Sequence, residues 1–204
     1  MEFDVLAESW DTQRRIDRAK IIAKQIENSI TIEKTDIALE FGCGTGLISL
    51  NLKDKFKEID LVDNSIEMLD KLRIKIAQFQ LANFNPIFLD ITANQELDKT
   101  YDVIYTSMAL HHVQDIDSII KYFYNKLMPG GRLCIVDLSM VSEIFHQQEK
   151  DFNGHHGFEQ NALKDILSKN EFLNITSNTF YESEKMIDNH CIPYSLFILS
   201  ANKS

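Results

Sequence analysis

Residues 37–46 read IALEFGCGTG, a short apolar run that ends in three glycines separated by single residues. The chain has 204 residues and only 7 glycines, and three of these seven are Gly42, Gly44 and Gly46. A short apolar run bounded by glycine predicts a buried strand followed by a tight turn. Glycine in such a turn permits positive φ and lets a ligand approach the backbone without a Cβ in the way. We therefore expect a ligand site at this turn.

Outward from the turn, short apolar runs alternate with segments of helical periodicity. The expected strands are 37–41, 59–62, 86–89, 101–106 and 132–138, and the expected helices are 46–56, 65–80, 115–127 and 158–169. Such alternation predicts an α/β fold with a Rossmann-like, mostly parallel sheet and helices on both faces. Two further strand-like runs, 172–181 and 194–201, are joined by a short polar segment and must pair antiparallel.

Two segments flank or interrupt this alternation. Residues 12–30 carry apolar side chains at helical spacing, so residues 1–30 are expected to form an N-terminal helical cap. Residues 139–157 are polar and predict a lid-like insertion. The chain has no linker rich in glycine, proline or serine, so residues 1–204 are expected to form a single domain.

Composition argues against several functional classes. A net charge of −10 repels a phosphate backbone, so nucleic acid is not an expected partner. Cys43, Cys134 and Cys191 lie far apart without a Cys-x-x-Cys pair, which fits neither a disulfide framework nor a zinc site and favours a reducing cytoplasm. The acidic start MEFDVLAESW and the lack of a long apolar stretch predict neither an export signal nor a membrane span.

The glycine spacing discriminates between ligands. The chain reads G-x-G-x-G, and Leu47 stands where the third glycine of the dinucleotide pattern G-x-G-x-x-G belongs, which disfavours NAD without excluding it. A P-loop is excluded because no Gly-Lys-Ser or Gly-Lys-Thr follows the turn. Asp63, 17 residues after Gly46, ends the second expected strand, where an acidic side chain accepts hydrogen bonds from a ribose diol. It supports a nucleoside-type ligand of either kind.

Five motifs follow one another in order: ALEFGCGTG at 38–46, LVDNS at 61–65, FLDI at 88–91, YDVIYTSMALHHV at 101–113 and LMPGGRLCIVDL at 127–138. Together they resemble the class I S-adenosylmethionine-dependent methyltransferases, in particular the small-molecule group similar to ubiquinone and menaquinone methyltransferases. The resemblance implies a seven-stranded sheet with an antiparallel last strand. It also implies S-adenosyl-L-methionine as cofactor, S-adenosyl-L-homocysteine as product, and in-line methyl transfer to a small-molecule acceptor.

The resemblance further implies roles for individual residues. Ten positions would bind the cofactor: Glu40, Gly42, Cys43, Gly44, Asp63, Asn64, Met68, Asp90, Ile91 and Ser107. The glycine turn would hold the methionine portion, with Glu40 directed toward its amino group. Asp63 would accept from both ribose hydroxyls, and Asp90 and Ile91 would contact the adenine. Structural alternatives stay open, such as a simple tight turn or an acid at a helix N-terminus.

Histidines are the candidates for removing a proton from the acceptor. His111, His155 and His156 are expected near the substrate entrance, and imidazole titrates near neutrality. A structural role is the alternative for each. No metal site is expected, because no carboxylate stands at a recognisable ligand spacing. Trp10 either closes over the cofactor or contacts the core.

Two other functions stay open. The lack of an unmistakable catalytic residue allows a catalytically silent, cofactor-binding regulatory module, and the glycine cluster allows, more weakly, an NAD-dependent oxidoreductase. The fourth expected strand is followed by Ser107-Met108-Ala109 and not by the Asn/Asp-Pro-Pro-Tyr sequence of enzymes that methylate base amines, which favours a small-molecule acceptor over DNA. The sequence carries no signal of oligomeric state.

Overall fold

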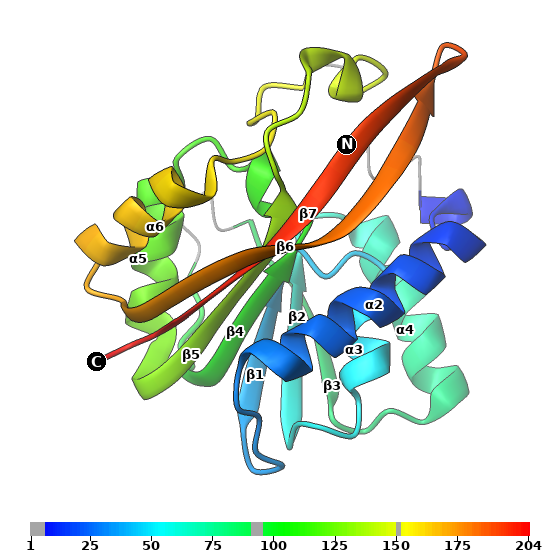
Figure 1. Cartoon of the computed structure of the whole chain (residues 1–204). Helices are drawn as coiled ribbons and strands as arrows, with labels where there is room; N and C mark the ends of the chain where they lie inside the picture. Colours follow the sequence, from blue (N-terminus) through cyan, green and yellow to red (C-terminus); the bar gives the residue numbers. More distant parts are fainter. Residues whose placement is uncertain (1–6, 91–95, 150–151) are drawn as a thin grey trace.

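The computed structural model describes residues 7–90, 96–149 and 152–204, in which seven strands form one sheet (Figure 1). The strands are β1 (Ile37–Phe41), β2 (Glu58–Asp63), β3 (Phe84–Phe88), β4 (Tyr101–Ser107), β5 (Leu127–Leu138), β6 (Leu173–Ile187) and β7 (His190–Asn202). Their order is β3-β2-β1-β4-β5-β7-β6. Strands β1 to β5 pair parallel, whereas β7 is antiparallel to both of its neighbours, β5 and β6. The expected Rossmann-like sheet with an antiparallel last strand is confirmed.

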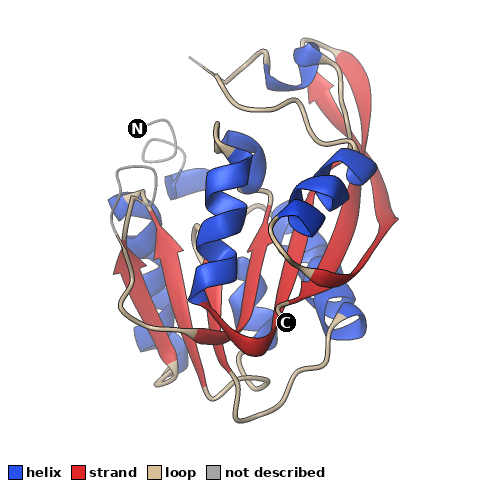
Figure 2. Cartoon of the chain, turned by 90° about the vertical axis from the view of Figure 1, so that its left-hand side faces the viewer, coloured by secondary structure: helices blue, strands red, loops and turns tan. Residues whose placement is uncertain are grey.

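Helices cover both faces of this sheet (Figures 1 and 2). The helices are α2 (Gln13–Ser29), α3 (Leu47–Leu52), α4 (Ile66–Phe79), α5 (Ile116–Lys126) and α6 (Gln160–Lys169), with short 3₁₀ turns η1 (Ala7–Ser9), η3 (Leu110–His112) and η4 (Glu143–His146). One buried cluster joins α2, α3 and α4 to the first face, and a second cluster joins α5 and α6 to the other. None of the helices in the described ranges has the length and apolar character needed to cross a bilayer.

The central strands read as continuous apolar runs because both of their faces are covered. In strand β5, successive side chains point to opposite faces of the sheet. Cys134 and Val136 belong to the first cluster, whereas Leu133 and Ile135 belong to the second. All four side chains are fully buried. The sheet is therefore the middle layer of three.

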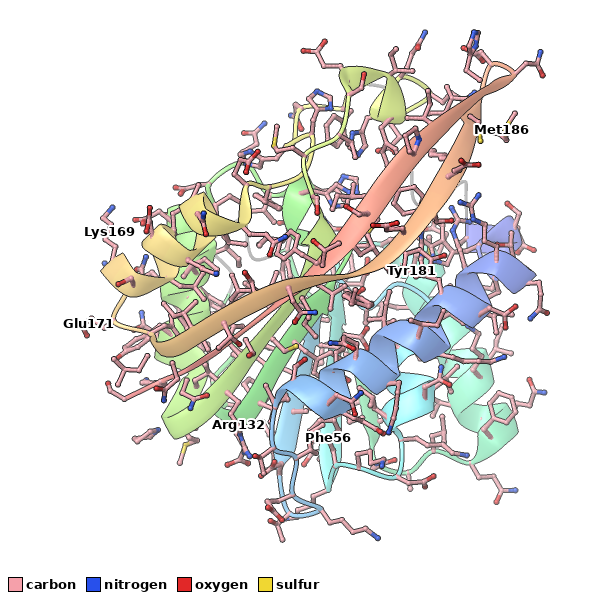
Figure 3. The ribbon with its side chains drawn as sticks, viewed as in Figure 1. Phe56, Arg132, Lys169, Glu171, Tyr181 and Met186 are labelled. Carbon is pink, nitrogen blue, oxygen red and sulfur yellow. The ribbon has the colours of Figure 1, made fainter. Side chains whose placement is uncertain are left out.

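The C-terminal hairpin is longer than the sequence predicts. The residues expected to form a polar connection extend both strands, so β6 runs to Ile187 and β7 begins at His190. Asp188 and Asn189 form the two-residue turn between them, at φ of 47° and 65°. Positive φ at both positions is typical of the type I′ turn that suits a twisted hairpin, and Asp and Asn tolerate it. Figure 3 shows Met186 near the end of this hairpin.

The insertion at 139–157 is held at both of its ends. Ser139 donates its N–H to the carbonyl of Ser195 at 3.0 Å, and Val141 donates to the carbonyl of His156 at 2.9 Å. Between these points the chain forms η4, whose Phe145 carbonyl accepts a hydrogen bond from Lys185 of the hairpin at 2.8 Å. The insertion therefore lies at the carboxyl end of β5, and its role as a lid stays a prediction.

Candidate active site

The glycine turn between β1 and α3 requires glycine at each of its three positions. Gly42, Gly44 and Gly46 have φ of 70°, 51° and 78°. A Cβ on Gly42 would lie 2.3 Å from the Cβ of Ala109, and one on Gly46 would lie 2.5 Å from a methyl group of Leu72. The turn thus combines left-handed backbone with close packing against the segment after β4 and against α4.

Asp63 joins this turn to the neighbouring strand. One oxygen of its carboxylate accepts the N–H of Gly44 at 2.7 Å, and the other accepts the N–H of Ser65 at 2.9 Å. Ser65 begins α4, and its hydroxyl oxygen accepts the N–H of Met68 at 3.2 Å. The carboxylate therefore lies between the glycine turn and the start of α4. Asn64 follows Asp63 in the chain, and the Met68 side chain in the first turn of α4 is buried.

Glu40 is a buried carboxyl on β1, next to the turn. Its oxygen accepts a hydrogen bond from the Ser49 hydroxyl of α3, and that hydroxyl lies 2.6 Å from the phenol oxygen of Tyr105. Burial raises the pKa of Glu40 to about 8, although the bond from Ser49 opposes the shift. At neutral pH this carboxyl is mostly protonated, and a cation brought beside it would favour its ionised form.

The segment before α2 lies against the glycine turn. The indole nitrogen of Trp10 lies 3.7 Å from the position that a Cβ on Gly44 would take. Asp11 accepts a hydrogen bond from the Thr45 hydroxyl at 2.6 Å and pairs with Lys75 at 2.5 Å. Trp10 therefore lies beside the glycine turn. Asp11, which no sequence pattern singled out, ties the segment to the turn.

Other residues expected to bind the cofactor lie at neighbouring strand ends. Ser107 is the last residue of β4, and Asp90, partly buried, follows β3. Cys43 is buried within the glycine turn, where burial raises the pKa of its thiol well above the ordinary value. Ile91 lies outside the described residues. Nine of the ten expected positions are therefore described, and they follow or adjoin the carboxyl ends of β1 to β4.

His111 and Asp137 form a buried pair at the carboxyl end of β4 and β5. Nδ1 of His111 lies 2.6 Å from one Asp137 oxygen, and the His111 backbone N–H donates to the other at 3.2 Å. The two side chains are 4% and 0% exposed. A carboxylate in this position fixes the orientation of the imidazole ring. Sequence reasoning missed Asp137, although an acid inside the apolar run CIVDL was a visible signal.

The remaining histidines take different positions. His155 donates its backbone N–H to the His111 carbonyl at 2.7 Å, while its ring nitrogen lies 3.2 Å from the Gln114 carbonyl. His156 lies 3.1 Å from His146, nitrogen to nitrogen, and the His146 ring stacks on Phe152. Burial lowers the pKa of His146 to about 3, so it stays neutral at physiological pH. The described residues contain no group of three side chains arranged to hold a metal.

Comparison with known proteins connects this geometry to a family. Residues 39–133 match the model of a methyltransferase domain. An uncharacterized methyltransferase of Schizosaccharomyces pombe is 30% identical over 115 residues, which cover 53% of this chain and 40% of that protein. The chain is similar in sequence to methyltransferases over this region, which includes the glycine turn. An uncharacterized methyltransferase of Staphylococcus carnosus is 30% identical over 154 residues, 74% of this chain and 64% of that protein.

Solved methyltransferase structures share the fold. Phosphoethanolamine N-methyltransferase 2 of Haemonchus contortus, in complex with S-adenosyl-L-methionine, superimposes on this chain with a TM-score of 0.75 at 15% sequence identity. The aligned region covers 100% of this chain and 60% of the Haemonchus contortus chain. The chain spans 40% and 64% of the length of the two curated methyltransferases above. The family resemblance drawn from the five motifs is therefore confirmed, and the fold extends beyond them to the C-terminal strands.

Proposed function

We propose that this chain is a methyltransferase that transfers a methyl group from S-adenosyl-L-methionine to a small-molecule acceptor by in-line displacement. The observation that carries the proposal is the contact between Gly44 and Asp63, which joins a left-handed glycine turn to an acid at the adjacent strand end. Sequence similarity to methyltransferases and the cofactor present in the Haemonchus contortus structure support the same ligand. Neither the sequence similarity nor the cofactor of that structure supports a silent regulatory module or an NAD-dependent oxidoreductase.

The cofactor, when bound, supplies a methyl group on a sulfonium that is already activated. The work left to the chain is to position the two reactants and to exclude water. Asp63 would accept hydrogen bonds from ribose hydroxyls in place of the backbone N–H groups it now contacts, and Glu40 would ionise beside the amino group. Trp10 would cover the glycine turn.

His111 is the residue we propose to take a proton from the acceptor. Asp137 holds the Nδ1 side of its ring, which leaves Nε2 as the nitrogen for the acceptor. His155 is less suited, because its ring nitrogen lies beside the Gln114 carbonyl. His156 is less suited because its Nδ1 lies beside His146.

Titration calorimetry with S-adenosyl-L-homocysteine and with NAD tests the cofactor. We expect the first to bind and the second to give no heat of binding; the opposite result would overturn the proposal. A screen of metabolites with tritiated S-adenosyl-L-methionine then tests the enzyme itself. Transfer of label to a small molecule supports catalysis, whereas binding without transfer to any of the metabolites supports the silent module.

The expected surroundings of the protein follow from this proposal. A small-molecule acceptor and an acidic chain leave no role for nucleic acid. A location in the cytoplasm stays a prediction based on cysteine spacing, and all three cysteines have free thiols in the structure.

A further inference from the structure

A short strap formed by residues 7–12 lies against the glycine turn and α4. It contains the 3₁₀ turn η1 and ends at Thr12, the N-cap of α2. Figure 1 shows this strap in dark blue at the start of α2, beside α4. The indole nitrogen of Trp10 lies 3.7 Å from the position of a Cβ on Gly44, the residue whose N–H contacts Asp63. A ligand that approached Gly44 from this side would therefore meet the indole.

Ion pairs and hydrogen bonds hold the strap in this position. Asp11 accepts the Thr45 hydroxyl at 2.6 Å and pairs with Lys75 of α4 at 2.5 Å. Lys75 also donates to the Thr45 carbonyl at 2.8 Å, which joins the strap, the turn and α4 at one point. A second ion pair, between Glu8 and Lys71, involves a Glu8 side chain that is 84% exposed, whereas Asp11 and Lys75 are 33% and 15% exposed. Because water weakens exposed pairs, the Asp11–Lys75 pair is the stronger of the two.

The strap contributes little to the hydrophobic core. Ala7 is buried, but residues 7–12, all of which the structure describes, supply no member of either core cluster. Helix α2, which follows directly, is anchored by four buried side chains: Ala19, Ile22, Ala23 and Ile26. Segments with few buried apolar contacts open locally at much lower free energy than core helices do. The strap is therefore able to leave the turn by pivoting at Thr12 while α2 stays in place.

We propose that the strap controls the exchange of the cofactor at the glycine turn, and that the Asp11–Lys75 ion pair is the latch that keeps it closed. The inference rests on the proposed function and adds the step that governs entry and release. An open strap exposes the turn, and a closed strap covers it. Because the latch joins two protein groups to each other, it stabilises the closed strap to the same extent with the cofactor bound or absent. Weakening the latch therefore speeds entry and release alike and leaves the equilibrium affinity unchanged.

Asp11→Asn tests the latch, because the amide keeps the shape and still accepts the Thr45 hydroxyl but removes the ion pair. We expect the association and dissociation rate constants of S-adenosyl-L-homocysteine, measured by surface plasmon resonance, to rise together by about fivefold, with Kd kept within about twofold. Asp17→Asn is the matched control, since it breaks an exposed ion pair of α2, with Lys20, and should change neither rate. Added salt should speed both rates more in the unmodified chain than in Asp11→Asn.

Hydrogen exchange measures the opening of the strap without any ligand. The Trp10 N–H donates to the Ala7 carbonyl at 3.4 Å, and the Thr12 N–H donates to the Trp10 carbonyl at 2.8 Å. A single helical turn is not stable by itself, so these N–H groups exchange when the strap leaves its contacts. We expect their exchange to be about fivefold faster in Asp11→Asn than in the unmodified chain. Exchange at Ile22 and Ile26, in the buried part of α2, should be unchanged.

Either of two results in Asp11→Asn would overturn the inference: unchanged exchange of the strap, or faster exchange of the strap without a parallel rise of both rate constants. A change in the dissociation rate alone would make Asp11 an ordinary binding contact. Lys75→Gln breaks the same ion pair from α4 and replaces Asp11→Asn if melting curves show that the latter does not fold. Failure of the unmodified chain to bind S-adenosyl-L-homocysteine would instead overturn the proposed function. Because hydrogen exchange needs no ligand, the two failures are distinguishable.

Discussion

The carboxyl edge of the sheet has two halves that are built differently. At the ends of β1 and β2, backbone groups define the geometry: three glycines of the turn have positive φ, and two backbone N–H groups donate to the carboxylate of Asp63. At the ends of β4 and β5, side chains from distant segments meet, as His111 and Asp137 do across 26 positions. The first half is therefore sensitive to a single added methyl group. The second is sensitive to the loss of a hydrogen-bonding partner.

The sharpest way to separate the halves is His111→Gln. Because His111 lies in the second half, we expect methyl transfer to fall by about 10²–10⁴-fold while affinity for S-adenosyl-L-homocysteine stays unchanged. The rate is measured with tritiated donor and the acceptor from the metabolite screen, as a function of pH. His190→Gln, at the exposed start of β7, is the control. If His155→Gln lost methyl transfer to this extent while His111→Gln stayed active, the proton acceptor would be His155 and not His111.

The glycine turn should fail when a methyl group is added at Gly42. The new Cβ would meet Ala109 at 2.3 Å with φ at 70°, so we expect a loss of about 2–5 kcal/mol in unfolding free energy and about 100-fold in cofactor affinity. Gly130→Ala is the matched control, because its φ is 75° and no atom lies within 4 Å. It should cost only about 1–2 kcal/mol. If Gly42→Ala and Gly130→Ala lowered the unfolding free energy equally in denaturant melts, backbone strain alone would account for the effect at Gly42, without the contact to Ala109.

Asp63→Asn tests the acid between the turn and α4. An amide keeps the shape but replaces a charged acceptor, so affinity for S-adenosyl-L-homocysteine should fall about 10- to 30-fold in calorimetry. Asp54→Asn makes the same change at an exposed position and should have no effect. Normal nucleoside affinity in Asp63→Asn would show that Asp63 serves only to hold the turn.

Glu40 should make stability fall as the pH rises. Its pKa is about 8 in the folded protein and about 4.3 in an unfolded chain, so between these values the folded state binds more protons. Raising the pH through that window therefore removes stability, by at most about 1.4 kcal/mol per unit. Denaturant melts from pH 6.5 to 8 should show a shallower slope for Glu40→Gln than for the unmodified chain. Equal slopes would contradict a buried, protonated Glu40.

The backbone-defined half was the half that could be predicted from sequence. Gly42 and Gly44 follow β1, and Asp63 is the last residue of β2, so local order along the chain carries their positions. The contact between His111 and Asp137 depends on strand register, which no local pattern encodes. The hairpin beyond residue 181 was missed because polar residues alternate along an exposed ribbon and resemble a loop. Asp11 was missed because its partners, Thr45 and Lys75, belong to other elements.

The chain contains a single tryptophan, and that tryptophan is Trp10, whose indole lies beside the glycine turn. All indole emission therefore arises from one place, beside the glycine turn that we propose binds the cofactor. The protein carries its own optical reporter, and occupancy of the turn can be followed by fluorescence without attaching a dye. Arg15, whose guanidinium lies 3.9 Å above the same ring, places a positive charge next to that reporter.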